Sequence, residues 1–297
     1  MYLICMKGYY NMDLTSPRTI RNIQEQFGFT FKKGLGQNFL TARNILEEIV
    51  DAAEIESGVI EVGPGFGVLT SELAQNSDKV VTIEIDERLI DVLDYTLAEY
   101  DNVKIINEDI LKLDLKKVID DEFKGEKVSI AANLPYYITT PIITKLLEEK
   151  LPIKNIVVMV QKEVAERMSA KPSTKDYGAI TVLCQYYTEP SIVANVPASL
   201  FVPPPKVDSA VLKLKILDKP SVEVKDEGVF FRVVKAAFSQ RRKTLLNCLS
   251  ANFPIPKDEI STLLESIGIA PSRRGETLSR RDRKSTRLNS SHTDISY

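Results

Sequence analysis

The chain of 297 residues is expected to fold as an α/β protein with a mainly parallel sheet, followed by a small all-helical C-terminal domain. Two observations predict this. Apolar strand-like runs alternate with amphipathic helical segments from about residue 40 to 160, which is typical of a parallel sheet covered by helices. After Lys219 and Pro220 the pattern becomes purely helical, and this change places a domain boundary near residue 218.

The individual elements follow from periodicity and from the turn residues between them. The expected strands of the alternating region are 58–62, 79–85, 103–107, 128–132 and 155–160. The expected helices are 68–75, 87–100, 111–120, 141–150 and 162–168. Two later runs, 191–196 and 210–216, flank a Pro-rich loop and are expected to add an edge hairpin. The second domain is predicted to contain helices at 228–239, 242–251 and 257–267.

The bulk composition narrows the class of protein. With 43% hydrophobic and 27% charged residues, it is ordinary for a soluble domain. No apolar run approaches the roughly 20 residues that span a bilayer. Three cysteines without a close pair and a single His argue against a disulfide or zinc framework, so we expect no metal and a cytoplasmic location. The net charge of −2 means that nucleic-acid binding would need a local basic patch.

The two ends differ from the rest in composition. Met12 opens a polar stretch that makes an equally good start, so residues 1–11 are interpreted as an upstream extension. Residues 280–297 are rich in Arg, Ser and Asn without apolar periodicity, which predicts disorder or foreign sequence. The expected organisation is therefore a flexible segment 1–16, an α/β domain 17–218 and a helical domain 219–279.

A glycine-rich loop follows the first predicted strand. Gly63, Gly65 and Gly67 allow a sharp turn and a close backbone approach to a ligand. The dinucleotide fingerprint would need Gly at the position of Val68, so this loop departs from it. On its own the loop fits either a nucleotide-like ligand or a structural turn.

Acidic residues follow the next two predicted strands, where ligands of doubly wound sheets bind. Glu84 lies about 20 residues after Gly63, the spacing at which a carboxylate grips a ribose diol. Its alternative role is a solvated acid at a helix start. Asp109 is expected either to accept from an adenine amino group or to cap a helix beginning at Ile110.

The fourth predicted strand runs into Asn133, Leu134, Pro135 and Tyr136. The Asn side-chain oxygen and a backbone carbonyl are acceptors, the Pro nitrogen cannot donate, and the Tyr ring can stack. Acceptors beside a ring suit a flat group that carries an amino group, such as adenine turned out of its strand. The alternative is an ordinary strand-to-turn junction.

With these residues the chain resembles the ribosomal RNA adenine dimethylases, specifically the KsgA/RsmA branch that acts on small-subunit rRNA. The matching segments run from about residue 17 to 279; they are 34–40, 61–65, 133–136, 201–211 and 238–245. The segments at 203–209 and 238–244 are the most specific, whereas many methyltransferases share the glycine loop. Residues from Arg280 onward depart from the family pattern, which puts the packing of the last helix in doubt.

The resemblance implies a Rossmann-like methyltransferase domain with a seven-stranded sheet and S-adenosyl-L-methionine as methyl donor. It implies two methyl transfers to each of two adjacent adenosines in a hairpin near the 3′ end of 16S rRNA, during ribosome biogenesis. The implied cofactor contacts are Asn38, Leu40, Gly63, Gly65, Glu84, Asp109 and Asn133. The implied catalytic segment is Asn133, Leu134, Pro135 and Tyr136, with Tyr136 and Phe201 stacking on the substrate base.

Arg241, Arg242 and Lys243 are expected to open a helix of the second domain. Such a cluster is usually a solvated helix face, but together with the resemblance it predicts contact with RNA phosphates. The expected partner is the small ribosomal subunit or its precursor, without membrane or metal, and the protein is expected to be a monomer.

Three other interpretations stay open at this stage. An Erm-type enzyme would dimethylate one adenosine of 23S rRNA and confer antibiotic resistance. A nucleic-acid-binding assembly or transcription factor could keep the fold with little catalysis. A NAD-dependent dehydrogenase is the most distant alternative, since it leaves the acceptor-and-ring segment unexplained.

Overall fold

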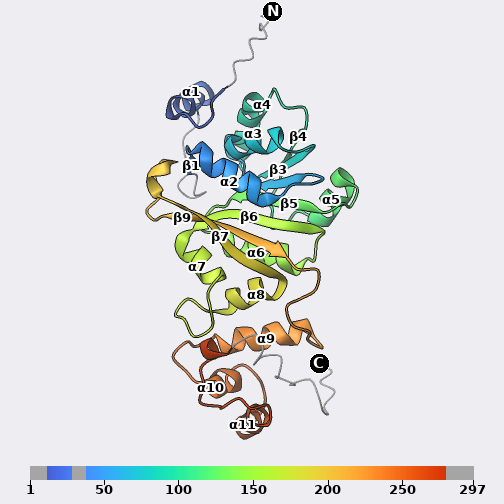
Figure 1. Ribbon diagram of the computed structural model, residues 1–297, viewed down its shortest axis with the longest axis vertical. Coiled ribbons are helices and arrows are strands. Elements are labelled where there is room, and N and C mark those ends of the chain that lie inside the picture. The colour runs from blue at the N-terminus through green and yellow to red at the C-terminus, as the bar shows by residue number, and fades with distance from the viewer. Residues whose placement is uncertain (1–11, 29–37, 279–297) are drawn as a thin grey trace, which may run out of the picture. The chain divides into compact units, whose positions relative to one another are not determined.

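The computed structural model describes residues 12–28 and 38–278 (Figure 1). The chain divides into two compact units. The first comprises the described residues up to 165 together with 191–216, and the second comprises 166–190 and the described residues from 217 onward. The second unit therefore also takes a segment from the middle of the chain. The domain limits at 16, 218 and 279 stay predictions.

A seven-stranded sheet forms the centre of the first unit, which confirms the predicted fold class. Its strands in spatial order are β4 (Val103–Asn107), β3 (Val80–Glu84), β2 (Val59–Val62), β5 (Val128–Asn133), β6 (Ile153–Gln161), β9 (Ser209–Ile216) and β7 (Thr188–Val196). The first five are parallel, and β9 pairs antiparallel with β6. As expected, β7 and β9 are neighbours at one edge.

The apolar runs of the central strands have a simple cause. All residues of β2 and β3 are buried, because helices cover both faces of a parallel sheet. In contrast, β4 at the other edge is only partly buried.

The order of the strands reverses at β2: the chain proceeds from β2 to β3 and β4 on one side, and then to β5 and β6 on the other. Ligands of such sheets bind at this switch point, beyond the carboxyl ends of the strands.

The first unit has helices near the five predicted ranges and two earlier helices, at residues 17–27 and 43–53, that were not predicted. They are α1 (Pro17–Phe27), α2 (Arg43–Ala53), α3 (Val68–Gln75), α4 (Ile90–Thr96), α5 (Leu115–Phe123) and α6 (Thr139–Glu148), and α7 (Lys162–Met168) leads toward the second unit. The start predicted for α5 at residue 111 is wrong. Asp114 caps this helix by accepting a hydrogen bond from the Lys117 backbone N–H, so the helix begins at Leu115.

A second, two-stranded sheet joins distant parts of the first unit. β1 (Phe39–Leu40) pairs antiparallel with β8 (Phe201–Val202). Beyond it, the backbone N–H of Thr41 donates to the Leu200 carbonyl at 2.9 Å. The segment before α2 is thereby tied to the segment before β9, and this pairing positions Asn38 and Leu40. The periodicity of two-residue strands is too short for the sequence to predict them.

The second unit is built mainly from helices: α8 (Ala179–Tyr187), α9 (Glu227–Ala237), α10 (Leu245–Ser250) and α11 (Lys257–Ser266). Tyr186 lies at the centre of an aromatic cluster, stacked on Phe230 with ring centroids 5.1 Å apart. A second apolar cluster joins α9, α10 and α11 through residues such as Leu249 and Leu264. No helix in residues 12–28 and 38–278 is long and apolar enough to cross a membrane.

The basic cluster of the second unit does not open a helix, which corrects that expectation. Arg241, Arg242 and Lys243 lie in the turn that precedes α10. Thr244 is the N-cap, and its side chain accepts from the Asn247 backbone N–H at 3.4 Å. Because the cap residue starts the helix, α10 begins at Leu245 and the three basic residues stay outside it.

Gly275 marks a close backbone approach in the second unit. A Cβ built there would lie 2.4 Å from the Ala237 carbonyl oxygen at the end of α9.

We predict that Gly275→Ala lowers the free energy of unfolding by about 1–3 kcal/mol, the cost of overpacking. Gly178→Ala is the matched control, since a Cβ at Gly178 meets nothing within 4 Å. Denaturant unfolding would measure both, and equal effects of the two variants would contradict the steric explanation.

Candidate active site

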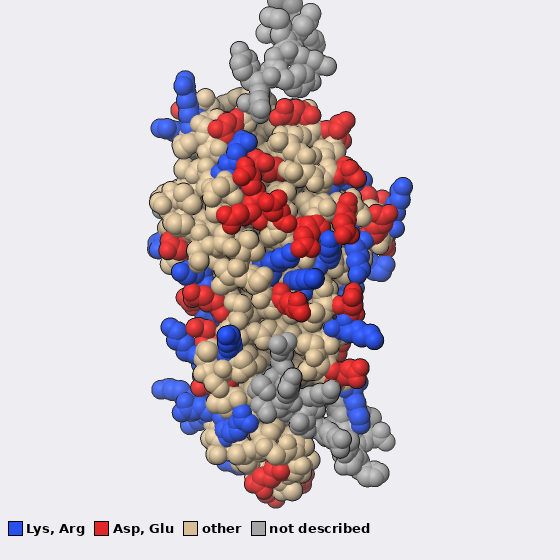
Figure 2. Space-filling model, viewed as in Figure 1, with Lys and Arg blue, Asp and Glu red and all other residues tan. Residues whose placement is uncertain are grey.

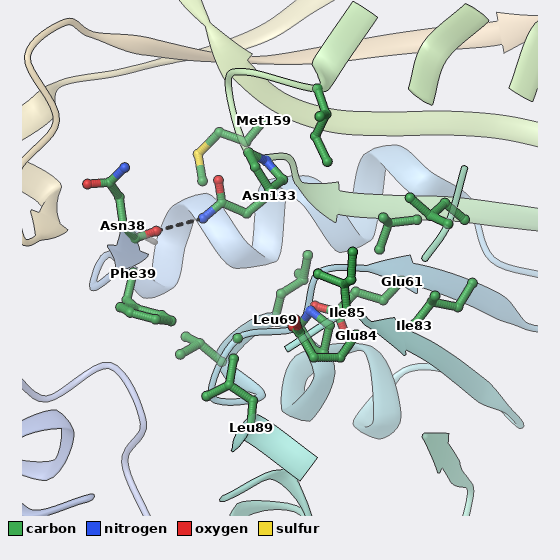
Figure 3. Close-up of a pocket in the computed structure, with 18 of the residues that line it drawn as sticks. Asn38, Phe39, Glu61, Leu69, Ile83, Glu84, Ile85, Leu89, Asn133 and Met159 are labelled. Atoms are coloured by element: carbon green, nitrogen blue, oxygen red, sulfur yellow. Dashed lines mark hydrogen bonds between the residues drawn. The ribbon is translucent and has the colours of Figure 1, made fainter. Parts of the chain in front are cut away.

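A pocket opens at the switch point of the sheet, at the carboxyl ends of β2, β3, β4 and β5 (Figure 3). It contains about 990 Å³ of space between atoms, part of it open solvent. The lining comes from the segment around β1, from the glycine loop after β2 and from the residues that follow β3, β4 and β5.

The glycine loop requires glycine for two reasons. Gly63, Gly65 and Gly67 all have positive φ, at 70°, 61° and 86°, a region that other residues rarely adopt. In addition, a Cβ on Gly65 would lie 2.5 Å from a ring carbon of Phe39. That ring stacks on Phe66 with centroids 4.2 Å apart. The loop backbone therefore lines the pocket at Gly63 and Gly65 while the two aromatic rings support it.

Glu84 ends β3 and lines the pocket; the residue is only 5% exposed, so it is not a solvated acid. Burial raises its pKa to about 6, although hydrogen bonds from backbone N–H groups of Asp86 and Gly65 act in the opposite direction. The Asp86 N–H lies 2.8 Å from Oε1. The carboxylate is therefore held in place and mostly ionised at neutral pH.

Asp109 follows β4 and also lines the pocket. Its Oδ1 accepts from the Leu111 backbone N–H at 2.9 Å, and Lys112 Nζ lies 3.7 Å from Oδ2. This hydrogen bond caps a turn, not a helix, because α5 begins only at Leu115. The helix-capping alternative for Asp109 is therefore wrong, and its carboxylate is fixed at the pocket by the turn.

Asn133, the last residue of β5, contributes a fixed amide to the pocket. Its Nδ2 donates to the Asn38 carbonyl oxygen at 3.0 Å, the dashed line in Figure 3. Because this bond engages the amide nitrogen, Oδ1 is the atom presented as an acceptor. The bond also links β5 to the segment that enters β1.

The two residues after Asn133 differ in whether their backbone carbonyl oxygens already accept hydrogen bonds. The Pro135 carbonyl accepts from the Ile138 backbone N–H at 3.2 Å and from Thr139 Oγ1 at 3.2 Å. For Leu134, the backbone N–H donates to the Met159 carbonyl at 3.1 Å, whereas no residue in the described part of the chain donates to its carbonyl oxygen. Leu134 is therefore the better source of a second acceptor, although its side chain is buried.

Two neighbouring tyrosines occupy the turn that follows Pro135. Tyr136 is half-buried, and its hydroxyl lies 2.7 Å from Ser209 Oγ on β9. Tyr137 is 55% exposed and lines the pocket. Sequence reasoning considered only Tyr136, and nothing in the sequence indicates which of two adjacent turn residues faces a pocket.

Glu61 is a second residue that the sequence pattern did not single out. It lies within β2, lines the pocket and is 1% exposed. Thr70 Oγ1 on α3 donates to its Oε2 at 2.5 Å. Burial raises the pKa of Glu61 to about 8, and the nearby Glu84 carboxylate acts in the same direction. A carboxyl group inside an apolar strand was the available signal, since such groups are rarely buried without a role.

The structure brings together most of the predicted cofactor and catalytic residues. The pocket is lined by Asn38, Leu40, Gly63, Gly65, Glu84, Asp109, Asn133 and Pro135. Three others are not part of its lining: Leu134, Tyr136 and Phe201. Phe201 is 2% exposed within β8, so contact with a base would require its ring to move. Residues 34–37, the first part of the matching segment 34–40, lie outside the described residues.

Arg241, Arg242 and Lys243 belong to the second unit and are exposed. Arg241 Nε lies 3.9 Å from Glu276 Oε2. Figure 2 shows Lys and Arg side chains gathered over the α9–α10 part of this unit. Across residues 12–28 and 38–278, no group of three or more His, Cys, Asp or Glu side chains is arranged to hold a metal ion.

Known proteins resemble the chain over most of its length. The family profile described as Ribosomal RNA adenine dimethylase matches residues 28–282. Proteins named Ribosomal RNA small subunit methyltransferase A, from Bacillus mycoides and Bacillus anthracis, are each 55% identical over 273 residues, covering 90% of this chain and 94% of the relative.

Two solved structures extend the comparison. A dimethyladenosine transferase from Plasmodium falciparum is 30% identical with a TM-score of 0.70, covering 84% of this chain and 96% of that one. The 23S rRNA methyltransferase ErmE is 27% identical with a TM-score of 0.64, covering 85% and 100%.

The raised pKa of Glu61 predicts a pH-dependent stability. The group binds its proton more tightly in the folded chain, where its pKa is about 8, than at its ordinary pKa of 4.5. Its contribution is therefore complete below about pH 4.5 and is lost as the pH rises through about 8. We predict that the melting temperature of Glu61→Gln falls less between pH 6 and 9 than that of the wild type.

Thermal unfolding followed by circular dichroism at each pH would test this. Glu54→Gln is the control, because the hydrogen bond from Lys213 lowers the pKa of Glu54 to about 2, so that it does not titrate in this range. Parallel pH profiles of wild type and Glu61→Gln would contradict the assignment.

Proposed function

Because the chain belongs to the ribosomal RNA adenine dimethylase family, we propose that it dimethylates two adjacent adenosines in a hairpin loop near the 3′ end of 16S rRNA during ribosome biogenesis. It is an rRNA adenine dimethyltransferase, and S-adenosyl-L-methionine is its methyl donor. The observation that carries the small-subunit assignment is the 55% identity to enzymes named for that subunit, against 27% to ErmE.

The pocket has the chemistry that the donor requires. Gly63 and Gly65 present backbone without a side chain to the pocket, which suits a ligand that lies against the loop. The Glu84 carboxylate is positioned to accept from ribose hydroxyls, and Asp109 from the adenine amino group. Asn38 and Leu40 border the same space from β1. We therefore assign cofactor binding to these residues together with Asn133.

The catalytic segment would act by orienting the target amine. The donor, when bound, supplies an activated methyl group on a positively charged sulfur. Asn133 Oδ1 and the Leu134 carbonyl accept the two N–H bonds of the adenine amine, which favours a pyramidal nitrogen with a localised lone pair. Alignment of the reacting groups contributes about 7–11 kcal/mol at best.

The Tyr136 ring supplies the stacking surface for the base. Its hydroxyl contact with Ser209 fixes the ring on β9, and base stacking is worth about 1–3 kcal/mol. After one transfer the amine keeps a single N–H, so only one acceptor is used in the second round. The released proton passes to water. Phe201 is kept as the proposed second stacking face.

The remaining proposals concern the partner. We assign RNA phosphate contacts to Arg241, Arg242 and Lys243, since the net charge of −2 gives the whole chain no general attraction to RNA. The protein would act as a monomer in the cytoplasm on the small subunit or its precursor.

Incubation with labelled donor and undermethylated ribosomal subunits tests the function, with the modified bases mapped by primer extension. We expect label on two adjacent adenosines of 16S rRNA. Label on 23S rRNA would indicate the Erm-type activity instead, and no transfer to either rRNA would indicate a binding factor on the same fold.

Asn133→Ala is predicted to lower methyl transfer by at least about 100-fold, the scale of losing a group that aligns the reaction. Binding of S-adenosyl-L-homocysteine should be largely retained, because the glycine loop and Glu84 are unchanged. Asn102→Ala is the matched control: its amide also donates to backbone carbonyls, those of Ala74 and Ser77, away from the pocket. Near-normal turnover of Asn133→Ala would refute the mechanism.

Replacing Arg241, Arg242 and Lys243 by Gln is predicted to weaken binding to the undermethylated small subunit. The slope of log K against log salt should become shallower by about 0.7–0.9 for each phosphate that is no longer neutralised. Replacing Lys116, Lys117 and Lys124 in the first unit by Gln removes the same charge and is the control. Filter-binding titrations over a range of salt give both slopes, and equal changes in the two triple variants would exclude a local patch.

A further inference from the structure

Tyr137 is a pocket residue without a role in the site described above. It stands next to Tyr136 in the turn after β5, and the Ile138 N–H closes this turn on the Pro135 carbonyl at 3.2 Å. The two side chains lie in different places. The Tyr136 hydroxyl is hydrogen-bonded to Ser209 on β9, whereas Tyr137 lines the pocket. The Tyr137 ring therefore borders the pocket, whereas the Tyr136 ring is not part of its lining.

Tyr137 is a large, exposed side chain that lines the pocket. It is 55% exposed, and Ile85, which follows Glu84 at the end of β3, is 53% exposed and lines the same pocket. Large apolar surfaces left in water at a concave site are stabilised when a flat apolar ligand covers them. Two such surfaces border this pocket.

The surroundings of Tyr137 indicate which half of a ligand it would meet. Burial raises the pKa of its hydroxyl, and the carboxylates of Asp109 and Glu84 raise it further. All three side chains line the pocket. Tyr137 therefore lies on the side of the pocket where the two carboxylates are placed to receive an adenosine.

We propose that Tyr137 is a cofactor-binding residue whose ring covers the adenosine half of S-adenosyl-L-methionine and of its product, S-adenosyl-L-homocysteine. This inference rests on the proposed function, since it requires an adenosine at Glu84 and Asp109. The ring adds apolar contact on the solvent side of the pocket, where the carboxylates provide only polar contact. Its contribution should come from the ring and not from the hydroxyl, for which no hydrogen bond is needed.

Titration calorimetry with S-adenosyl-L-homocysteine on the full chain tests this. We expect Tyr137→Ala to raise Kd about tenfold, the size of one stacking contact, and Tyr137→Phe to stay within about twofold of the wild type. In steady-state assays Tyr137→Ala should raise KM for the donor with kcat nearly unchanged, because the contact is made equally before and during transfer.

Tyr95→Ala is the matched control, since Tyr95 is 43% exposed in the same unit and does not line the pocket. Wild-type affinity in Tyr137→Ala, or an equal loss in Tyr95→Ala, would overturn the inference while leaving the function intact. Failure of the wild type to bind S-adenosyl-L-homocysteine would instead overturn the function.

A spectroscopic variant gives a readout that is independent of truncation. The chain contains no Trp, so Tyr137→Trp carries a single indole at the proposed contact. Its emission should change on titration with S-adenosyl-L-homocysteine and saturate at the calorimetric Kd. The emission of Tyr95→Trp, the matched control, should stay constant. An unresponsive indole at position 137 would contradict the proposal even if Tyr137→Ala failed to fold.

Discussion

The parallel pairing of β2 with β5 is the constraint on which the site depends. β2 has β3 on one side and β5 on the other; after β2 the chain moves toward β3, and after β5 it moves in the opposite direction, toward β6. The connections that follow β2 and β5 therefore diverge and leave space above the sheet. The glycine loop and the Asn133 segment border this space from opposite sides. Glu84 and Asp109 reach it because β3 pairs in parallel with β2, and β4 pairs in parallel with β3.

Two of the carboxyl groups that line the pocket, those of Glu61 and Glu84, are buried. Burial disfavours ionisation of both Glu61 and Glu84, and the Glu84 charge disfavours ionisation of Glu61 further. Their hydrogen bonds differ: Glu84 accepts from backbone N–H groups, whereas Glu61 accepts from the Thr70 hydroxyl. Near neutral pH the first is mostly ionised and the second mostly protonated. Glu84 thus offers a charged acceptor to a ligand, while its buried neighbour Glu61 adds no second full charge.

The sequence was sufficient to predict the strands of the seven-stranded sheet and the polar residues that follow them. Apolar runs bounded by turn signals identify buried parallel strands, and the carboxyl ends of parallel strands meet at one edge. Glu84, Asp109 and Asn133 could therefore be placed in one site from their positions after the strands. The start of α5 could not be predicted, because Asp109 and Asp114 are equally suitable N-cap residues by type. Only the folded turn shows that Asp114 caps the helix.

The direction of side chains in turns could not be predicted from the sequence either, because only the folded turn determines it. Tyr136 and Tyr137 are chemically alike, and the turn geometry decides which ring meets β9 and which meets the pocket. The apolar strand around Glu61 signals that this residue is buried, but not the face of the sheet to which its side chain points. Alternation along a strand identifies an exposed face, but β2 has none, since all four of its residues are buried. The sequence pattern gives no sign of the face to which such a side chain points.

The pairing of β1 with β8 has a consequence for biosynthesis. Asn38 and Leu40 are aligned by residues 200–202, and β6 is covered on one side by β9. During translation the chain must therefore be synthesised beyond residue 202 before β1 can pair with β8 and complete this side of the pocket. Non-local contacts of this kind form late and slowly. Until then, the nascent chain can form local helices and the early parallel strands, but it remains incompetent to hold its ligand.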